Sequence, residues 1–169
     1  MSDAQDDTAL PSTIVRILNP PNFLKHKTKV APGLLDELLA RADKMVAALQ
    51  GEFEAGTELR IKRLAEIAGG AWKLPATRED AVLQLRRQCH EIKGEAGTFG
   101  FPLLSDIADL FGNYLRETPL AKQQAEAIKA YVDTFDVVWT RRIKGNGGHL
   151  GTQLIESLMK VNEKGQTVS

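Results

Sequence analysis

The sequence has very little cysteine, and this scarcity restricts its chemistry. Its 169 residues include a single cysteine, Cys89, so an intramolecular disulfide framework and a cysteine-rich zinc site are both excluded. Net charge is lacking too, because 22 Lys and Arg residues balance 22 Asp and Glu residues. A chain balanced in this way is not expected to bind nucleic acid or a membrane surface through bulk positive charge.

Long apolar runs and targeting signals are also missing. No stretch approaches the roughly 20 apolar residues that span a bilayer. Residues Met1 to Asp7 are polar and acidic, whereas a secretory signal begins with a basic region followed by an apolar one. We therefore expect a cytoplasmic protein of one domain, long enough to bury a sizeable core.

Helical periodicity is abundant in the intervals between prolines. Proline breaks helix interiors but suits a first turn, so the intervals between the 7 prolines are where helices can run. After Pro32, apolar residues recur at three- and four-residue spacing. The pattern does not decide whether residues 34–72 form one helix or two with a break at residues 51–56. Thr77, followed by acidic residues, predicts the start of the next helix.

Further helices are predicted from Pro102, from the N-cap and first-turn pair Thr118 and Pro119, and over about residues 152–163. No segment shows a sustained alternation of apolar and polar residues, so no sheet is predicted. The expected fold class is all-α, an up-and-down antiparallel four-helix bundle with extra terminal segments.

Three stretches are expected along the chain. Residues 1–31 are predicted to form an extended arm that lies on the bundle, and residues 32–144 the bundle itself. Residues 145–169 are predicted to form a glycine-rich loop and a short C-terminal helix. The glycines between 145 and 151 indicate a flexible connection.

A group of polar residues around His90 stands apart from the helical core pattern. The apolar stripe of this helix consists of Val82, Leu85, Cys89, Ile92 and Ala96. On a wheel of 3.6 residues per turn, His90 points roughly 120° away from the centre of that stripe, toward solvent or a partner. Its neighbours within one or two turns are Arg86, Arg87, Lys93, Gly94 and Gly97. Cys89 lies on the stripe and is interpreted as a packing residue.

These residue types suit phosphoryl chemistry. An exposed neutral imidazole is a nucleophile at physiological pH. Lys93, with one of the two arginines before His90, would offset the negative charge of a phosphoryl group on that histidine. Gly94 and Gly97 each cost the helix about 1 kcal/mol relative to alanine, which indicates that something approaches the helix closely there.

The spacing resembles the signature of histidine-containing phosphotransfer (Hpt) domains: a histidine, two residues, Lys-Gly, five residues and a glycine. His90, Lys93, Gly94 and Gly100 match it. The resemblance covers roughly residues 32–144 and implies a four-helix bundle whose exposed histidine exchanges phosphoryl groups with aspartates. It implies that His90 is the phosphoacceptor, that Lys93 stabilises the phosphoryl group and that Gly94 leaves room for the partner.

The resemblance also indicates which partners to expect. Response-regulator receiver domains would dock on the His90 face, with Gly97, Arg86 and Arg87 as further contacts, and a hybrid histidine kinase is a further candidate partner. No metal or cofactor of the chain's own is implied, because Mg²⁺ belongs to the receiver. Walker and Rossmann motifs are absent, so we expect a phosphoryl carrier without an ATP site rather than an enzyme.

Other interpretations of the same residues stay open. Each arginine is as well explained as an ordinary surface charge, and Gly97 and Gly100 can simply end the helix. A helical scaffold that sequesters a receiver or kinase would keep the bundle without transferring phosphoryl groups, its terminal helix serving for contact or for packing. A cofactor-binding bundle with His90 as axial ligand is disfavoured, because that ligand would face away from the core.

Overall fold

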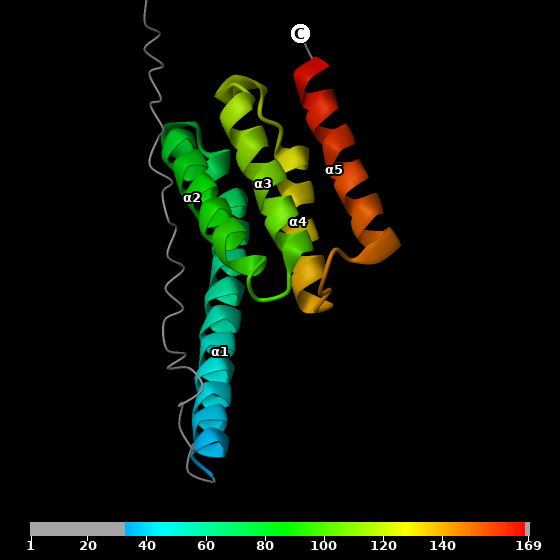
Figure 1. Ribbon diagram of the computed structural model, residues 1–169. Helices are drawn as coiled ribbons and strands as arrows, with labels where there is room; N and C mark the ends of the chain where they lie inside the picture. The colour runs from blue at the N-terminus through cyan, green and yellow to red at the C-terminus, as the bar shows by residue number, and fades with distance from the viewer. Residues whose placement is uncertain (1–32, 168–169) are drawn as a thin grey trace, which may run out of the picture. The chain divides into compact units, whose positions relative to one another are not determined.

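The computed structural model describes residues 33–167, which contain helices and turns but no strand (Figure 1). The five α-helices are α1 (Leu34–Gly69), α2 (Arg78–Ala96), α3 (Pro102–Glu117), α4 (Ala125–Thr140) and α5 (Gly148–Thr167). Three short 3₁₀ helices connect them: η1 (Ala71–Lys73), η2 (Pro75–Thr77) and η3 (Leu120–Lys122). The predicted all-α class is thereby confirmed for this range. The extended arm predicted for residues 1–31 lies outside the described residues.

The contacts divide the chain into two units, Met1–Ala40 and Arg41–Ser169. In the first unit, the leucines at the start of α1 are exposed to solvent. The second unit contains the whole buried core, from Phe53 to Leu158. Within residues 33–167, no helix has the length and apolar character needed to cross a membrane.

α1 is a single helix of 36 residues, which answers the question left open at residues 51–56. Its buried side chains all lie in the second half of the helix and are Phe53, Thr57, Ile61, Leu64 and Ile67. The first half presents no buried side chain to the core. Packing therefore anchors only the C-terminal half of α1, and the helix continues through Gly51 and Gly56 despite their low helix propensity.

Two of the predicted helix starts agree with the structure in position. Pro102 is the first residue of α3, as its fixed φ favours. α2 begins directly after Thr77, but the Thr77 hydroxyl donates to the carbonyl of Ala71 at 2.7 Å and makes no capping bond to α2. Thr77 therefore stabilises the segment between α1 and α2 and does not cap α2.

The predicted helix start at Thr118 and Pro119 is wrong, because α4 begins at Ala125. Thr118 ends α3 instead, and its amide donates to the carbonyl of Tyr114 at 3.0 Å. The buried Gln123 side chain then donates to the Thr118 carbonyl at 3.1 Å, which stabilises the turn between the two helices. The pair therefore marks the end of α3 and not the start of the next helix.

α3 lies at the centre of the second unit, in contact with α2, α4 and α5. Its buried residues combine with those of the neighbouring helices in one apolar cluster. Phe99 and Phe101 lie in the turn between α2 and α3. The ring of Phe99 stacks on Phe53 of α1 with centroids 4.3 Å apart, and the ring of Phe101 packs against Trp139 of α4 with centroids 5.4 Å apart. These rings hold the turn between α2 and α3 against α1 and α4.

The predicted loop over residues 145–151 and helix over about residues 152–163 have the wrong boundary, because the loop is shorter and the helix longer than predicted. α5 begins at Gly148 and extends over 20 residues. The connection before it is tied to the α2–α3 turn, since the Gly145 amide donates to Gly100 at 2.9 Å and its carbonyl accepts from Leu103 at 3.2 Å. A Cβ at Gly151 would lie 1.9 Å from the Asn146 carbonyl oxygen, so glycine allows a close approach there rather than a free linker.

Candidate functional site

His90 lies near the middle of α2 with its side chain exposed, as the helical wheel predicts. The five residues of the predicted apolar stripe are all buried on the other side of the helix. Among residues 33–163, His90 has no hydrogen-bond or ion-pair partner. Its imidazole is therefore exposed and is not occupied in holding the described fold together.

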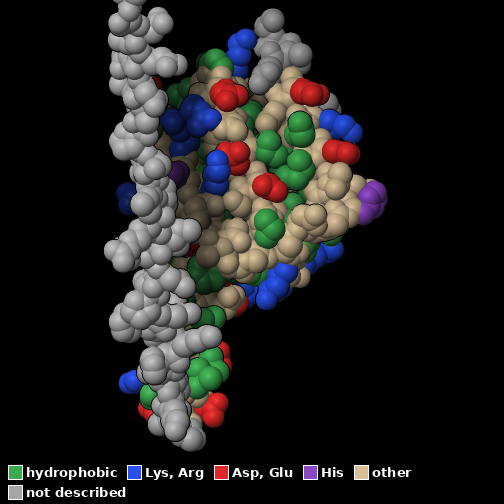
Figure 2. Space-filling view, in the orientation of Figure 1, with side chains coloured by type: hydrophobic (Ala, Val, Ile, Leu, Met, Phe, Trp, Pro, Cys, Tyr) green, Lys and Arg blue, Asp and Glu red, His purple; other side chains and the backbone are tan. Residues whose placement is uncertain are grey.

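His90 borders an open hollow of about 430 Å³ between α2 and α3. The hollow is lined by Leu83, Arg86, Arg87, Cys89, His90 and Lys93 of α2 and by Ala108, Asp109, Gly112, Asn113 and Arg116 of α3. Charged side chains of both signs are spread over this face of the molecule (Figure 2). Among the described lining residues, four basic side chains accompany one carboxylate, so the hollow favours an anionic group.

Lys93 crosses from α2 to α3 beside His90. Its Nζ donates to Asp109 Oδ1 at 2.7 Å. Its backbone carbonyl accepts a hydrogen bond from the Ser105 hydroxyl at 2.8 Å. Since residues three apart lie on one face of a helix, the ammonium lies on the same side of α2 as His90.

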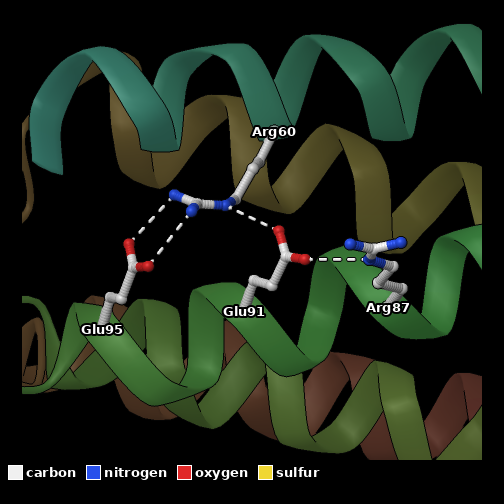
Figure 3. Close-up of polar contacts among 4 residues, drawn as sticks. All are labelled: Arg60, Arg87, Glu91 and Glu95. Carbon is white, nitrogen blue, oxygen red and sulfur yellow. Dashed lines mark hydrogen bonds and ion pairs between the residues drawn. The ribbon is translucent and has the colours of Figure 1, made fainter. Parts of the chain in front are cut away.

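The structure separates the two arginines that the sequence could not distinguish. Arg87 Nε donates to Glu91 Oε1 at 3.1 Å, and the other oxygen of Glu91 accepts from Arg60 Nε, also at 3.1 Å (Figure 3). Arg60 further forms a two-pronged pair with Glu95, with N···O distances of 3.0 and 3.1 Å. Arg87 is thus engaged in a network that joins α1 to α2, whereas the half-buried Arg86 has no such partner within residues 33–163.

This network also changes the acidity of Glu91. The hydrogen bond from Arg60 is the main cause, and the one from Arg87 the second, of a pKa for Glu91 below its ordinary value. The carboxylate therefore stays charged and keeps Arg87 on the α1 side of the helix.

The glycines near His90 differ in whether the backbone conformation or the surrounding atoms require glycine. Gly94 and Gly97 are exposed, and a Cβ built on either would have no atom of residues 33–163 within 4 Å. Gly97 directly follows the last residue of α2, and Gly100 has φ +84°, which favours glycine. Helix termination thus accounts for Gly100 and for the position of Gly97, but nothing in the described residues requires glycine at 94.

The Hpt domain family model matches residues 33–137. The chain belongs to the Hpt domain family. Members of this family are phosphoryl carriers that work through a histidine in two-component signalling. Comparisons with curated proteins and with solved structures found no match.

In this Hpt domain, α3 supplies site residues that sequence reasoning missed. Asp109, Asn113 and Arg116 line the hollow opposite His90, and Arg116 donates to the Asn113 side chain. Their spacing of four and three residues places them on one polar stripe of α3. That stripe was a readable signal, but only the packing of α3 on α2 brings it to the histidine.

Cys89 is a free cysteine buried on the apolar side of α2. Its thiol is buried next to His90 in sequence, and burial raises its pKa well above the ordinary value. A thiol that stays protonated is a poor nucleophile, so the residue serves packing, as its place on the apolar stripe predicts.

Proposed function

We propose that this Hpt domain relays a phosphoryl group between His90 and receiver-domain aspartates in a two-component phosphorelay. The observation that supports it most is an exposed His90 that has no hydrogen-bond or ion-pair partner among residues 33–163 and lies one turn from Lys93 in a predominantly basic hollow. On this proposal the C-terminal half of α1 joins α2, α3 and α4 as the family's up-and-down four-helix bundle, and α5 is an addition.

The transfer step requires little from this chain beyond a nucleophile and positive charge. A ring nitrogen of His90 attacks the phosphorus of the receiver's aspartyl phosphate, the N–P bond forms, and the P–O bond breaks as the aspartate leaves as a carboxylate. Lys93, with Arg86, offsets the charge on the transferred group. The receiver contributes its Mg²⁺, so the proposed carrier uses no ATP site, metal or cofactor of its own.

Docking of the receiver is proposed to occur over the His90 face. Gly94 leaves the helix surface low beside the histidine, and Gly97 extends that low surface by one turn. Arg86 is free to contact an acidic group of the partner, whereas Arg87 would first have to leave Glu91. A hybrid histidine kinase carrying a receiver would present the same kind of surface.

The test is a phosphotransfer assay with phosphorylated receivers as donors. We expect the wild-type chain to acquire an acid-labile, base-stable label that disappears in the His90→Gln variant. The matched control is His149→Gln, which removes another exposed histidine, on α5, and should retain the label. Label that persists without His90 would place the phosphoryl group elsewhere, and stable receiver binding without any label would favour the scaffold role.

A further inference from the structure

Within the described part of the chain, Asp109 is the only carboxylate among the side chains that line the His90 hollow. It accepts the 2.7 Å hydrogen bond from Lys93 Nζ, and the two side chains are 47% and 51% exposed, respectively. The cation that the proposed relay assigns to the phosphoryl group is therefore already paired with an acid when His90 carries nothing.

We propose that Asp109 is a positioning residue that competes with the phosphoryl group for Lys93. The inference rests on the proposed function in taking His90 as the phosphoacceptor. In the unmodified protein, Asp109 holds the ammonium against α3. When His90 is phosphorylated, the ammonium turns to the phosphoryl oxygens, because that group carries more charge and three strong acceptors.

The geometry allows Lys93 to change partners without unfolding anything. A half-exposed pair of this kind contributes little to stability, and a lysine ammonium sits on a flexible stem. The backbone of Lys93 stays in place, since its carbonyl is held by the Ser105 hydroxyl. The less exposed, two-pronged contact of Arg60 with Glu95 offers no such freedom.

This competition affects the direction of phosphoryl flow. A carboxylate that pairs with Lys93 only in the unmodified state stabilises that state relative to the phosphorylated one. Asp109 would thus keep the phosphoryl group from settling on His90 and leave it available to the next receiver. Removing the carboxylate should favour phosphorylation of His90 by a factor typical of an exposed ion pair, about two- to fivefold.

The experiment uses phosphoramidate, a small donor that needs no receiver. Its N–P bond breaks, ammonia leaves, and a new N–P bond forms on His90, whose appearance is followed by phosphorus NMR. We expect Asp109→Asn to be phosphorylated about two- to fivefold faster than wild type. Asp109→Glu should restore the wild-type rate. The matched control is Asp133→Asn, whose carboxylate pairs with Lys129 on α4 outside the hollow, and its rate should be unchanged.

The decisive comparison repeats the Asp109→Asn change in a Lys93→Ala chain. If Asp109 acts through Lys93, the double variant is phosphorylated at the same rate as Lys93→Ala alone. If Asp109→Asn accelerates phosphorylation equally in both backgrounds, the carboxylate merely repels the donor. If Asp109→Asn does not accelerate phosphorylation in the wild-type background, the carboxylate has no effect on this rate. Either result overturns the inference. Failure of phosphorylated His90 to pass its group to any receiver would instead overturn the relay, while leaving these rate comparisons valid.

Discussion

Gly94 lies in the last turn of α2, at a position where alanine would favour the helix more than glycine does. Among the described residues, a Cβ there would meet no atom within 4 Å, and glycine lowers the stability of a helix by up to about 1 kcal/mol relative to alanine. The described part of the fold gives no reason for this glycine, which agrees with the proposed docking of a partner close to α2.

The Gly94→Ala variant should therefore be more stable and less active in the relay. We expect its free energy of unfolding to rise by up to about 1 kcal/mol, measured by chemical denaturation, while phosphotransfer from a receiver slows. Gly51→Ala is the control, because Gly51 is also helical, exposed and open around its Cβ but lies on α1. Equal transfer rates in both variants would remove Gly94 from docking.

Glu91 makes the stability of the site region depend on pH. Hydrogen bonds from Arg60 and then Arg87 hold its pKa below the ordinary value. A carboxyl with a lowered folded-state pKa stabilises the fold above its unfolded-state pKa, near 4.3, and this contribution is lost as the pH falls through the folded-state value. We expect Glu91→Gln to flatten the loss of unfolding free energy below about pH 4.3.

The measurement for Glu91 is chemical denaturation at neutral pH and at several acidic values. Glu66→Gln is the control, since Glu66 pairs with Arg63 on the exposed surface of α1. A Glu91→Gln chain whose pH profile matches wild type would show that the network with Arg60 contributes nothing measurable.

At the residue scale, the sequence sufficed where the geometry is local. The positions of His90, Lys93 and Gly94 on one side of a helix follow from the helical repeat alone. The pairing of Lys93 with Asp109 and the engagement of Arg87 with Arg60's network depend on which helix packs against α2. Such contacts join residues distant in sequence, so periodicity could not reveal them.

At the scale of the element, α1 changes character along its length. Leu64 is fully buried, whereas Leu49, four turns earlier on the same helix, is 52% exposed. The apolar spacing of the two halves looks alike in sequence, because periodicity predicts a helix but not what covers its apolar face. Periodicity also placed the start of α4 too early. The turn before α4 is stabilised by the Gln123 side chain, which donates to the Thr118 carbonyl.

These two leucines give a matched test of α1. We expect Leu64→Ala to lower the free energy of unfolding by about 3–5 kcal/mol through the cavity it leaves. Leu49→Ala should change it by no more than about 0.5 kcal/mol. Both are measured by chemical denaturation of the full chain. A large loss for Leu49→Ala, especially one that depends on protein concentration, would mean that another molecule covers this half of the helix.

At the scale of the whole molecule, α5 belongs to the folded unit that carries the site. Leu158 is 2% exposed, and the Tyr131 hydroxyl of α4 donates to Asn162 at 2.8 Å. The connection before α5 is bonded to Gly100 in the turn that follows the histidine helix. The sequence predicted the existence of this helix from its apolar side, but its length and attachment depend on close backbone approaches at Gly147 and Gly151.

If α5 serves packing, its buried and exposed faces should respond differently to truncation of a side chain. We expect Leu158→Ala to cost about 2–5 kcal/mol of unfolding free energy. Met159→Ala, at the neighbouring position that is 49% exposed, should cost no more than about 0.5 kcal/mol. Phosphorylation of His90 should proceed at the wild-type rate in both, because neither residue lines the hollow. Slower transfer from a receiver in Met159→Ala at unchanged stability would instead make α5 a contact surface, as the scaffold interpretation requires.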